Sequence, residues 1–346
     1  MTACSPPVHT IDPLTDSRWP AFLDRHPRAS VFHTAEWLDS LKRTYGYEPF
    51  VLTTTASGPL ENGLVFCRVR TWAARRLVSL PFSDHCEPLV DRPDDLAAMV
   101  DHLVDEVRQH SWRSVELRPR LAAITGLAEG AIYQLHTLDI VRPADEIFAG
   151  FHHSSTQRAI RRAEREGLEY ETGTSEPLVS AFYALLRLTR RRHGLPPQPF
   201  AWFWNLAACL GDRLTVHLAS KDGKPVAGIL TLTFGKTLFY KYGGSDAKLH
   251  RLGGMPFLFW RAIQWAQEQG IEQLDLGRSD LDQPGLIAFK DHLGAARSTL
   301  TYFTWPPRKP RAAGGGLLSR VARRLVPLMP DTALDAVGRL LYRHVG

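Results

Sequence analysis

The sequence predicts an α/β (α+β) protein with two tandem domains, each a mixed and mostly antiparallel sheet flanked by helices. Three observations predict this class. The chain has 346 residues, more than one typical domain holds. Hydrophobic residues make up 44% and charged residues 23%, which leaves enough apolar surface for full cores. Both halves also present strands, turns, a helix and a closing strand in the same order.

The second half shows this order most clearly. Its strands are expected at 214–219, 226–234, 237–242 and 271–276, with a turn at 221–225. The helix before the last strand starts near Pro256, since proline needs no N–H partner in a first turn, and stops at Gly270. The first three strands therefore form an antiparallel meander.

The first half repeats the order, with a helix at 94–109 and strands at 49–55, 63–70, 77–80 and 114–118. Residues 63, 94 and 114 align with residues 227, 256 and 271 at offsets of 164, 162 and 157. Near-constant offsets of one domain length indicate duplication of a whole domain. Two unrelated domains with the same element order are the alternative.

Amphipathic helices are expected to open each half, at 34–43, 154–166 and 176–192. We therefore divide the chain into an N-terminal domain over 1–140, a C-terminal domain over 141–307 and a tail over 308–346. The tail holds the whole net charge of +6, because eight of its residues are basic and two are acidic. A basic amphipathic helix of this kind can lie on an anionic membrane surface. Docking onto the body is the alternative.

The sequence contains no metal-binding or membrane-spanning signal. The four cysteines show no pair spacing, which favours reduced thiols over disulfides or a zinc site. No run of about 18 apolar residues is present, and the N-terminus lacks a secretory signal pattern. We therefore expect a cytoplasmic protein, peripheral on the inner face of the membrane if the tail binds lipid.

A loop over 250–256, His-Arg-Leu-Gly-Gly-Met-Pro, leads into the second-half helix. The N–H groups and positive dipole end of a helix start suit a pyrophosphate. The loop resembles the Arg/Gln-x-x-Gly-x-Gly/Ala coenzyme A loop of the GNAT superfamily, although Pro256 departs from the last small position. An ordinary glycine turn before a helix is the alternative. The expected cofactor-binding residues are Arg251, Gly253, Gly254 and Met255.

Three further motifs surround this loop: Tyr-Lys-Tyr-Gly-Gly-Ser-Asp at 240–246, Leu-Asp-Leu-Gly-Arg at 274–278 and Gly-Leu-Ile-Ala-Phe-Lys at 285–290. As a set they resemble the C-terminal half of FemAB-type proteins, including an acetyltransferase-like group associated with exopolysaccharide and cell-wall assembly. Matches at 37–38, 79–85 and 156–167 extend the resemblance over about residues 30–305. The resemblance implies two GNAT-like domains.

The resemblance also implies roles for individual residues. Lys290 would stabilise negative charge on the donor or on a developing oxyanion, and Asp84 or His85 would accept a proton from the acceptor. The expected substrate-binding residues are Lys42, Asp91, Arg158, Arg161, Arg162, Tyr242 and Ser245. The three arginines share one helical face, where they could hold an anion. A solvated lysine and a solvent-facing row of arginines are the alternatives.

The function implied by the resemblance is acyl transfer. An acyl or aminoacyl group would move from acyl-CoA, such as acetyl-CoA, or from aminoacyl-tRNA to an amine or hydroxyl of a cell-envelope precursor, a lipid-linked glycan or a polysaccharide. We expect no permanently bound cofactor, no metal and no DNA partner. The electroneutral body and the coenzyme A-like loop favour acyl-CoA. The alternatives are a Fem-like, tRNA-dependent peptidoglycan aminoacyltransferase, a nucleic-acid-binding protein and an inactive scaffold.

Overall fold

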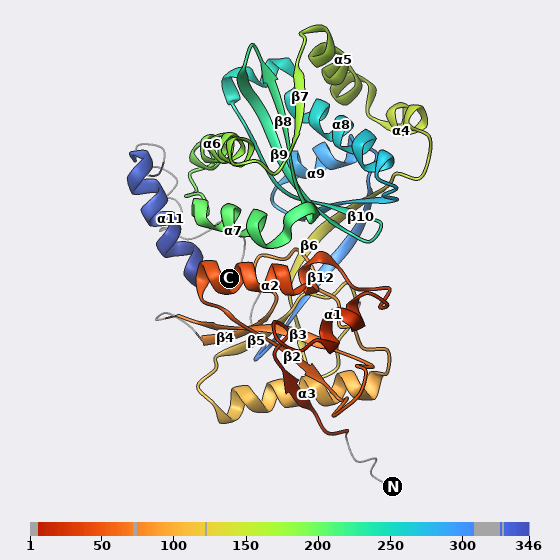
Figure 1. The fold of residues 1–346 in the computed structure, drawn as a ribbon, viewed down its shortest axis with the longest axis vertical. Coiled ribbons are helices and arrows are strands. Elements are labelled where there is room, and N and C mark those ends of the chain that lie inside the picture. The colour runs from red at the N-terminus through yellow and green to blue at the C-terminus, as the bar shows by residue number, and fades with distance from the viewer. Residues whose placement is uncertain (1–5, 72–74, 122, 308–325, 327–328, 346) are drawn as a thin grey trace. The chain divides into compact units, whose positions relative to one another are not determined.

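The computed structural model describes residues 6–71, 75–121, 123–307, 326 and 329–345 (Figure 1). They form two compact units. The first contains the described residues up to 133 together with 300–307 and 340–345, and the second contains 134–299, 326 and 329–339. The main stretch of the second unit therefore begins and ends earlier in the sequence than the domain expected at 141–307. Residues 303–305 belong to the first unit, because they pair with residues 115–117 of that unit.

The first unit is a sheet with helices packed against it. Its strands are, in spatial order, β1 (His9–Ile11), β2 (Glu48–Thr53), β3 (Leu64–Arg70), β4 (Arg75–Ser79), β5 (Ser114–Leu117) and the end of β12 (Ala296–Trp305). Only β4 and β5 pair in parallel among these strands. The helices are α1 (Arg18–Leu23), α2 (Ala35–Tyr45) and α3 (Pro93–Gln109). Residues Met99, Leu103 and Val107 of α3 lie in the core with Phe66 and Leu117 of the sheet.

The second unit repeats this plan. Its strands are, in spatial order, the end of β6 (Ala128–Asp139), β11 (Gln273–Asp280), β10 (Thr237–Ser245), β9 (Lys224–Phe234), β8 (Leu214–Lys221) and β7 (Glu169–Gly173). The last four form the antiparallel meander, and β10 pairs with β11 in parallel. The helices are α4 (Ala144–Gly150), α5 (Arg158–Arg165), α6 (Glu176–Arg192), α7 (Phe200–Leu210), α8 (Gly254–Glu268) and α9 (Pro284–Asp291), with the short turn η4 (Ala247–Leu252) before α8.

Helices cover both faces of the meander. Ala227 and Ile229 of β9 belong to the core that α5 and α8 close. Gly228, between them, faces the other side, where a Cβ would lie 3.2 Å from Phe182 and 3.4 Å from Leu185 of α6. Successive residues of a strand point to opposite faces, so α8 and α6 sandwich the sheet.

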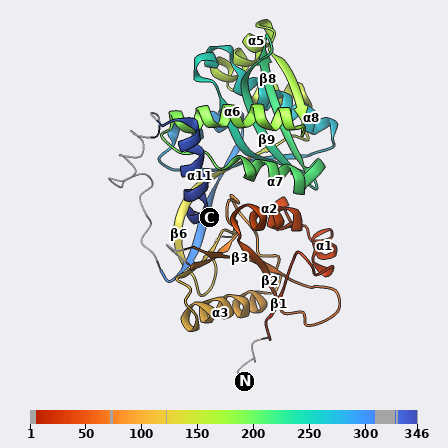
Figure 2. The ribbon, with the colours of Figure 1, turned by 60° about the vertical axis from the view of Figure 1, so that its left-hand side comes forward.

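The C-terminal helix α11 (Asp331–Val345) packs partly on α6 (Figure 2). Within the second unit, Asp331 forms ion pairs with Arg187 and Arg191, and the Tyr183 hydroxyl donates to Asp335 at 3.1 Å. Leu334 is fully buried. These contacts favour docking on the body for this part of the tail. The first expected tail helix, around 317–325, lies outside the described residues. Among the described helices, none has the length and hydropathy needed to cross a bilayer.

The core of the second unit contains a neutral histidine, which makes stability depend on pH. Burial lowers the pKa of His217 to about 3. The unfolded chain, with a pKa of about 6.5 at this residue, therefore binds more protons below about pH 6.5. The free energy of unfolding should then fall by up to about 1.4 kcal/mol per pH unit as the pH drops from 6.5 towards 3. Between about pH 7 and pH 5, the free energy of unfolding of His217→Gln should therefore fall by about 2 kcal/mol less than that of the wild type. Urea unfolding at the two pH values measures this difference.

The exposed His153 provides the control for this measurement. His153→Gln should lose as much stability between the two pH values as the wild type does. An equal loss in His217→Gln would assign the acid sensitivity to other groups.

Candidate active site

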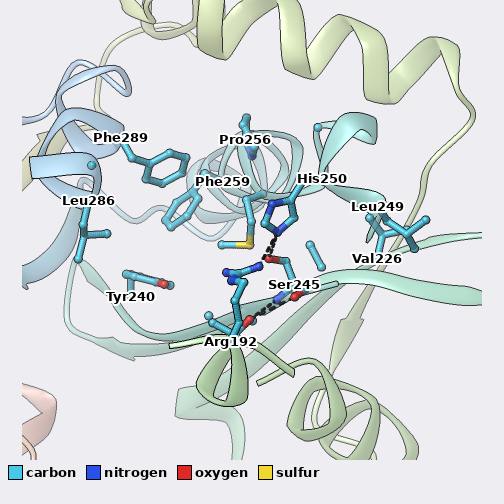
Figure 3. A pocket seen from close by; sticks show the side chains of 18 of the residues that line it. Arg192, Val226, Tyr240, Ser245, Leu249, His250, Pro256, Phe259, Leu286 and Phe289 are labelled. Carbon is cyan, nitrogen blue, oxygen red and sulfur yellow. Dashed lines mark hydrogen bonds between the residues drawn. The ribbon is translucent and has the colours of Figure 1, made fainter. Parts of the chain in front are cut away.

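The second unit holds a cavity of about 540 Å³ at the N-terminal end of α8 (Figure 3). Its walls come from β9 and β10, the last turn of α6, η4, the first turns of α8, and α9. The motifs at 240–246, 250–256 and 285–290 all contribute lining residues. Segments that are up to about a hundred residues apart in the sequence are thus brought to one place by the sheet.

The first turn of α8 lines this cavity. Gly253, with φ of 80°, turns the chain from η4 into the helix, and a Cβ on it would lie 2.4 Å from the Ala159 carbonyl oxygen. A Cβ on Gly254 would lie 2.9 Å from Val226 Cγ1. The first N–H groups of a helix have no acceptor inside it and carry partial positive charge. Gly254 and Met255, which line the cavity, therefore offer an anion two such N–H groups.

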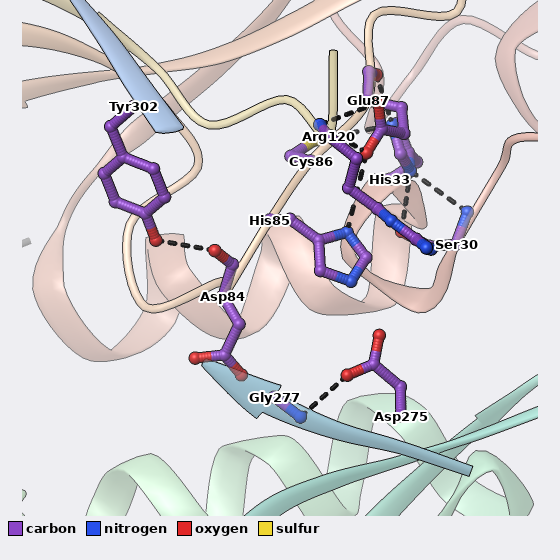
Figure 4. Close-up of polar contacts among 10 residues, drawn as sticks. All are labelled: Ser30, His33, Asp84, His85, Cys86, Glu87, Arg120, Asp275, Gly277 and Tyr302. Carbon is purple, nitrogen blue, oxygen red and sulfur yellow. Dashed lines mark hydrogen bonds and ion pairs between the residues drawn. The ribbon is translucent and has the colours of Figure 1, made fainter. Parts of the chain in front are cut away.

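Lys290 lines the same cavity from α9. Its side chain is only 2% exposed, and Nζ donates to the carbonyl oxygens of Gly277 at 2.8 Å and Arg278 at 3.1 Å. Gly277 has φ of 68°, and its N–H donates to the Asp275 carboxylate at 2.7 Å (Figure 4). This bend turns two carbonyls towards the ammonium and fixes its position. A buried cation held in one position is suited to stabilising a developing oxyanion.

Two further basic residues, Arg192 and His250, line the cavity that were not expected there. Arg192 Nη1 lies 3.0 Å from His250 Nε2, and the Ser245 hydroxyl lies 2.9 Å from the same nitrogen. Burial, and then the Arg192 guanidinium, lower the pKa of His250, while Asp246 opposes them. In the described parts of the chain, no carboxylate forms an ion pair with Arg192. The group is therefore an arginine and an imidazole at a cavity mouth without an acid between them, an arrangement that suits an anionic ligand.

Comparison with known proteins identifies this part of the chain. The model of the acetyltransferase (GNAT) domain matches residues 151–290, from the end of α4 to Lys290. These residues form a GNAT domain. The segment includes the cavity, the start of α8 and Lys290.

Individual relatives agree with this assignment. The UDP-N-acetylmuramoylpentapeptide-lysine N(6)-alanyltransferase of Weissella viridescens is 28% identical over 142 residues. The match covers 40% of this chain and 41% of that protein, so the chain spans about two fifths of the relative's length. The crystal structure of FemX is similar over 86% of this chain and 97% of its own, with 14% identity and a TM-score of 0.68.

A second structural likeness concerns the tandem arrangement. A tandem GNAT protein from the clavulanic acid biosynthesis pathway is similar over 88% of this chain and all of its own, with 13% identity and a TM-score of 0.55. The predicted tandem GNAT-like fold is thereby confirmed. The resemblance to FemAB-type proteins is confirmed by the GNAT match, the alanyltransferase and FemX.

Other residues expected in the GNAT domain lie away from the cavity. Arg251 is exposed and helps Lys221, with Arg162, to lower the pKa of Glu166. Tyr242 is buried in the core, where its hydroxyl accepts from Trp202 Nε1 at 2.9 Å. Both positions depend on which way a side chain points from its loop or strand. The motifs that contain Arg251 and Tyr242 do not determine the direction of these side chains.

The arginines of α5 are exposed to solvent, as in the alternative interpretation of that helix. None of Arg158, Arg161 and Arg162 lines the cavity, and Arg161 lies over the Phe148 ring with 5.5 Å to its centroid. Ser245 is the one expected substrate-binding residue that does line it. Arg192 also lies in the last turn of α6, where its charge complements the negative end of the helix. His250 was part of the loop motif at 250–256 but was not among the expected site residues.

The candidates in the first unit have different surroundings. Asp84 is half-buried, and its backbone oxygen accepts from the Tyr302 hydroxyl at 2.6 Å (Figure 4). His85 is buried, with Nδ1 3.8 Å from the Glu87 carboxylate. Lys42 is exposed at the end of α2, and Asp91 pairs with Arg28 at 2.6 Å at the surface. None of these four lines the GNAT-domain cavity, and their roles stay predictions from the resemblance.

Removing Arg192 is expected to weaken the binding of a phosphate-bearing donor about tenfold, since a hydrogen bond to a charged group contributes roughly 1.5–3 kcal/mol and this guanidinium is partly solvated. Arg192→Ala should also flatten the dependence of Kd on salt concentration, measured by isothermal titration. Arg190→Ala is the matched control, because it removes the same charge from the same helix outside the cavity. Equal losses in the two variants would indicate a general charge effect.

Proposed function

We propose that this chain is an acyltransferase whose GNAT domain holds an activated acyl donor in the cavity at the start of α8. It transfers the acyl or aminoacyl group to an amine or hydroxyl of a cell-envelope precursor or polysaccharide. The observation that carries the proposal is that Lys290 and the first N–H groups of α8 line one cavity. An anion-binding helix start beside a buried cation is suited to a donor that carries phosphates and a reactive carbonyl.

In this mechanism each residue has a separate task. The N–H groups of Gly254 and Met255, with Arg192, hold a phosphate of the carrier, and Lys290 stabilises the oxyanion that forms at the carbonyl. The acceptor's nitrogen or oxygen lone pair attacks the carbonyl carbon. The carrier then leaves as thiolate or alkoxide and takes up a proton, while the acceptor's own proton passes to a base. Catalysis rests on positioning and electrostatics, with no covalent enzyme intermediate.

The acceptor class is supported by the relative alone. That alanyltransferase acts, by its name, on the lysine of a UDP-N-acetylmuramoylpentapeptide. A lysine ε-amine is a suitable nucleophile for the step described above once it has lost its proton. We therefore propose a peptidoglycan-type precursor as the first acceptor to test, and a polysaccharide hydroxyl as the second.

The test is product formation with two donors. Purified protein is incubated with UDP-N-acetylmuramoylpentapeptide and either acetyl-CoA or alanyl-tRNA, and the acceptor is analysed by mass spectrometry. We expect the acceptor to gain the mass of the acyl group with at least one donor. An unchanged precursor and an unchanged polysaccharide with both donors, together with salt-dependent binding to any nucleic acid, would contradict the proposal and indicate a nucleic-acid-binding protein.

A further inference from the structure

The cavity of the GNAT domain has an apolar wall opposite its cationic mouth. Tyr240, Phe259 and Phe289 form a chain of edge-to-face contacts, with ring centroids 4.9 Å and 5.4 Å apart (Figure 3). Met255 and Leu286 continue this wall. Aromatic rings held by such contacts form a surface of fixed shape that binds apolar groups by excluding water.

No carboxylate is found among the residues that line the cavity in the described chain. Its ionisable side chains are Arg192, His250 and Lys290, together with the phenol of Tyr240. An aminoacyl group carries an α-ammonium next to its carbonyl, and an ammonium removed from water needs an anionic or hydrogen-bonding partner. If the carbonyl lies at Lys290, that ammonium would instead meet a second cation. Like charges at short distance in such a site repel strongly.

The size of the cavity also favours an uncharged group, and one larger than acetyl. Its volume of about 540 Å³ falls within the range of about 300–1,000 Å³ that sites for drug-sized ligands occupy. The carrier's phosphates would occupy the part of the cavity at the start of α8, and an acetyl group alone would leave most of the aromatic wall uncovered. Apolar space left empty forfeits contacts, whereas each methylene that fills such space adds binding energy.

We propose that the group transferred by this protein is an uncharged, apolar acyl chain longer than acetyl, bound against the wall of Tyr240, Phe259, Phe289 and Leu286. This inference rests on the proposed function and names its substrate class. The cationic mouth takes the phosphate-bearing carrier, which is coenzyme A or a carrier with the same phosphate chemistry. An aminoacyl donor should bind more weakly, because its α-ammonium would lie near Lys290.

The experiment measures Kd by isothermal titration for CoA and for acetyl-, butanoyl-, hexanoyl- and octanoyl-CoA, with alanyl-tRNA in parallel. We expect each added methylene to tighten binding by about three- to fourfold until the cavity is full. Leu286→Trp fills part of the cavity from a residue that is 36% exposed, so the fold should tolerate it. This variant should lose at least about tenfold more affinity for octanoyl-CoA than for acetyl-CoA.

Leu281→Trp is the matched control, because Leu281 is 58% exposed and does not line the cavity. It should behave as the wild type throughout the series. A Kd independent of chain length, or an equal effect of the two tryptophans, overturns the inference and leaves the proposed function standing. Tighter binding of alanyl-tRNA than of every acyl-CoA also overturns the inference and leaves the proposed function standing. If neither CoA nor any donor binds, the proposed function fails together with the inference.

Discussion

Replacing Lys290 by methionine is expected to lower kcat by about two to three orders of magnitude, the usual effect of removing one group that stabilises an oxyanion. Methionine keeps most of the side-chain length and apolar character but has no charge. The Kd of the donor should change far less, because Lys290 acts mainly on charge that develops in the transition state. The measurement is steady-state kinetics on folded protein, alongside the donor Kd.

The buried position of Lys290 requires a stability measurement beside the kinetics. The substitution leaves the carbonyls of Gly277 and Arg278 without this donor, which should lower the free energy of unfolding by about 1–3 kcal/mol. Lys236→Met, at a lysine that is 70% exposed at its side chain, controls for loss of charge. A Lys290→Met protein that is less stable but has unchanged kcat per folded molecule would show that the lysine only supports the β11 bend.

Gly253→Ala is expected to lower the free energy of unfolding by about 2–5 kcal/mol and to weaken donor binding. The residue has φ of 80°, which costs about 1–2 kcal/mol for a residue with a Cβ. Its Cβ would also lie 2.4 Å from the Ala159 carbonyl oxygen, and relieving such a clash typically costs a further 1–3 kcal/mol or so. Separating η4 and α8 from α5 would displace the N–H groups of Gly254 and Met255.

Gly223→Ala separates these two contributions. Gly223 has φ of 71°, but a Cβ there would meet nothing within 4 Å. We therefore expect the control to lose only the conformational part, about 1–2 kcal/mol, and to bind donor normally. Urea unfolding and isothermal titration of both variants provide the comparison. Equal destabilisation would mean that α5 can move away from a Cβ at Gly253 without loss of stability. The contact between Gly253 and Ala159 would then not position the loop.

Local signals in the sequence were sufficient to predict several of the helices. The predicted helix at 176–192 has the bounds of α6, and Thr34 caps α2 by accepting from the Trp37 N–H at 3.3 Å. The helix expected from Pro256 begins two residues earlier, at Gly254. Periodicity, capping residues and helix-breaking glycines act over a few residues, so one sequence suffices to place them.

Long-range pairing and side-chain direction were not predictable in this way. Strands β6 and β12 were missed, since β12 pairs with β5 across almost two hundred residues and neither strand has a strong alternating pattern. In the loop at 250–256 the motif favoured Arg251, yet the packing of η4 turns His250 into the cavity and leaves Arg251 exposed. Arg192 joins the site because α6 ends beside β10, which no local pattern in α6 indicates.

The most direct test of the account is a crystal structure of the protein with a non-hydrolysable acyl-CoA analogue. We expect the analogue's phosphates at the N–H groups of Gly254 and Met255, and its carbonyl oxygen within hydrogen-bond distance, up to about 3.2 Å, of Lys290 Nζ. An analogue bound elsewhere, with the cavity at the start of α8 still open, would contradict the assignment of this cavity as the donor site.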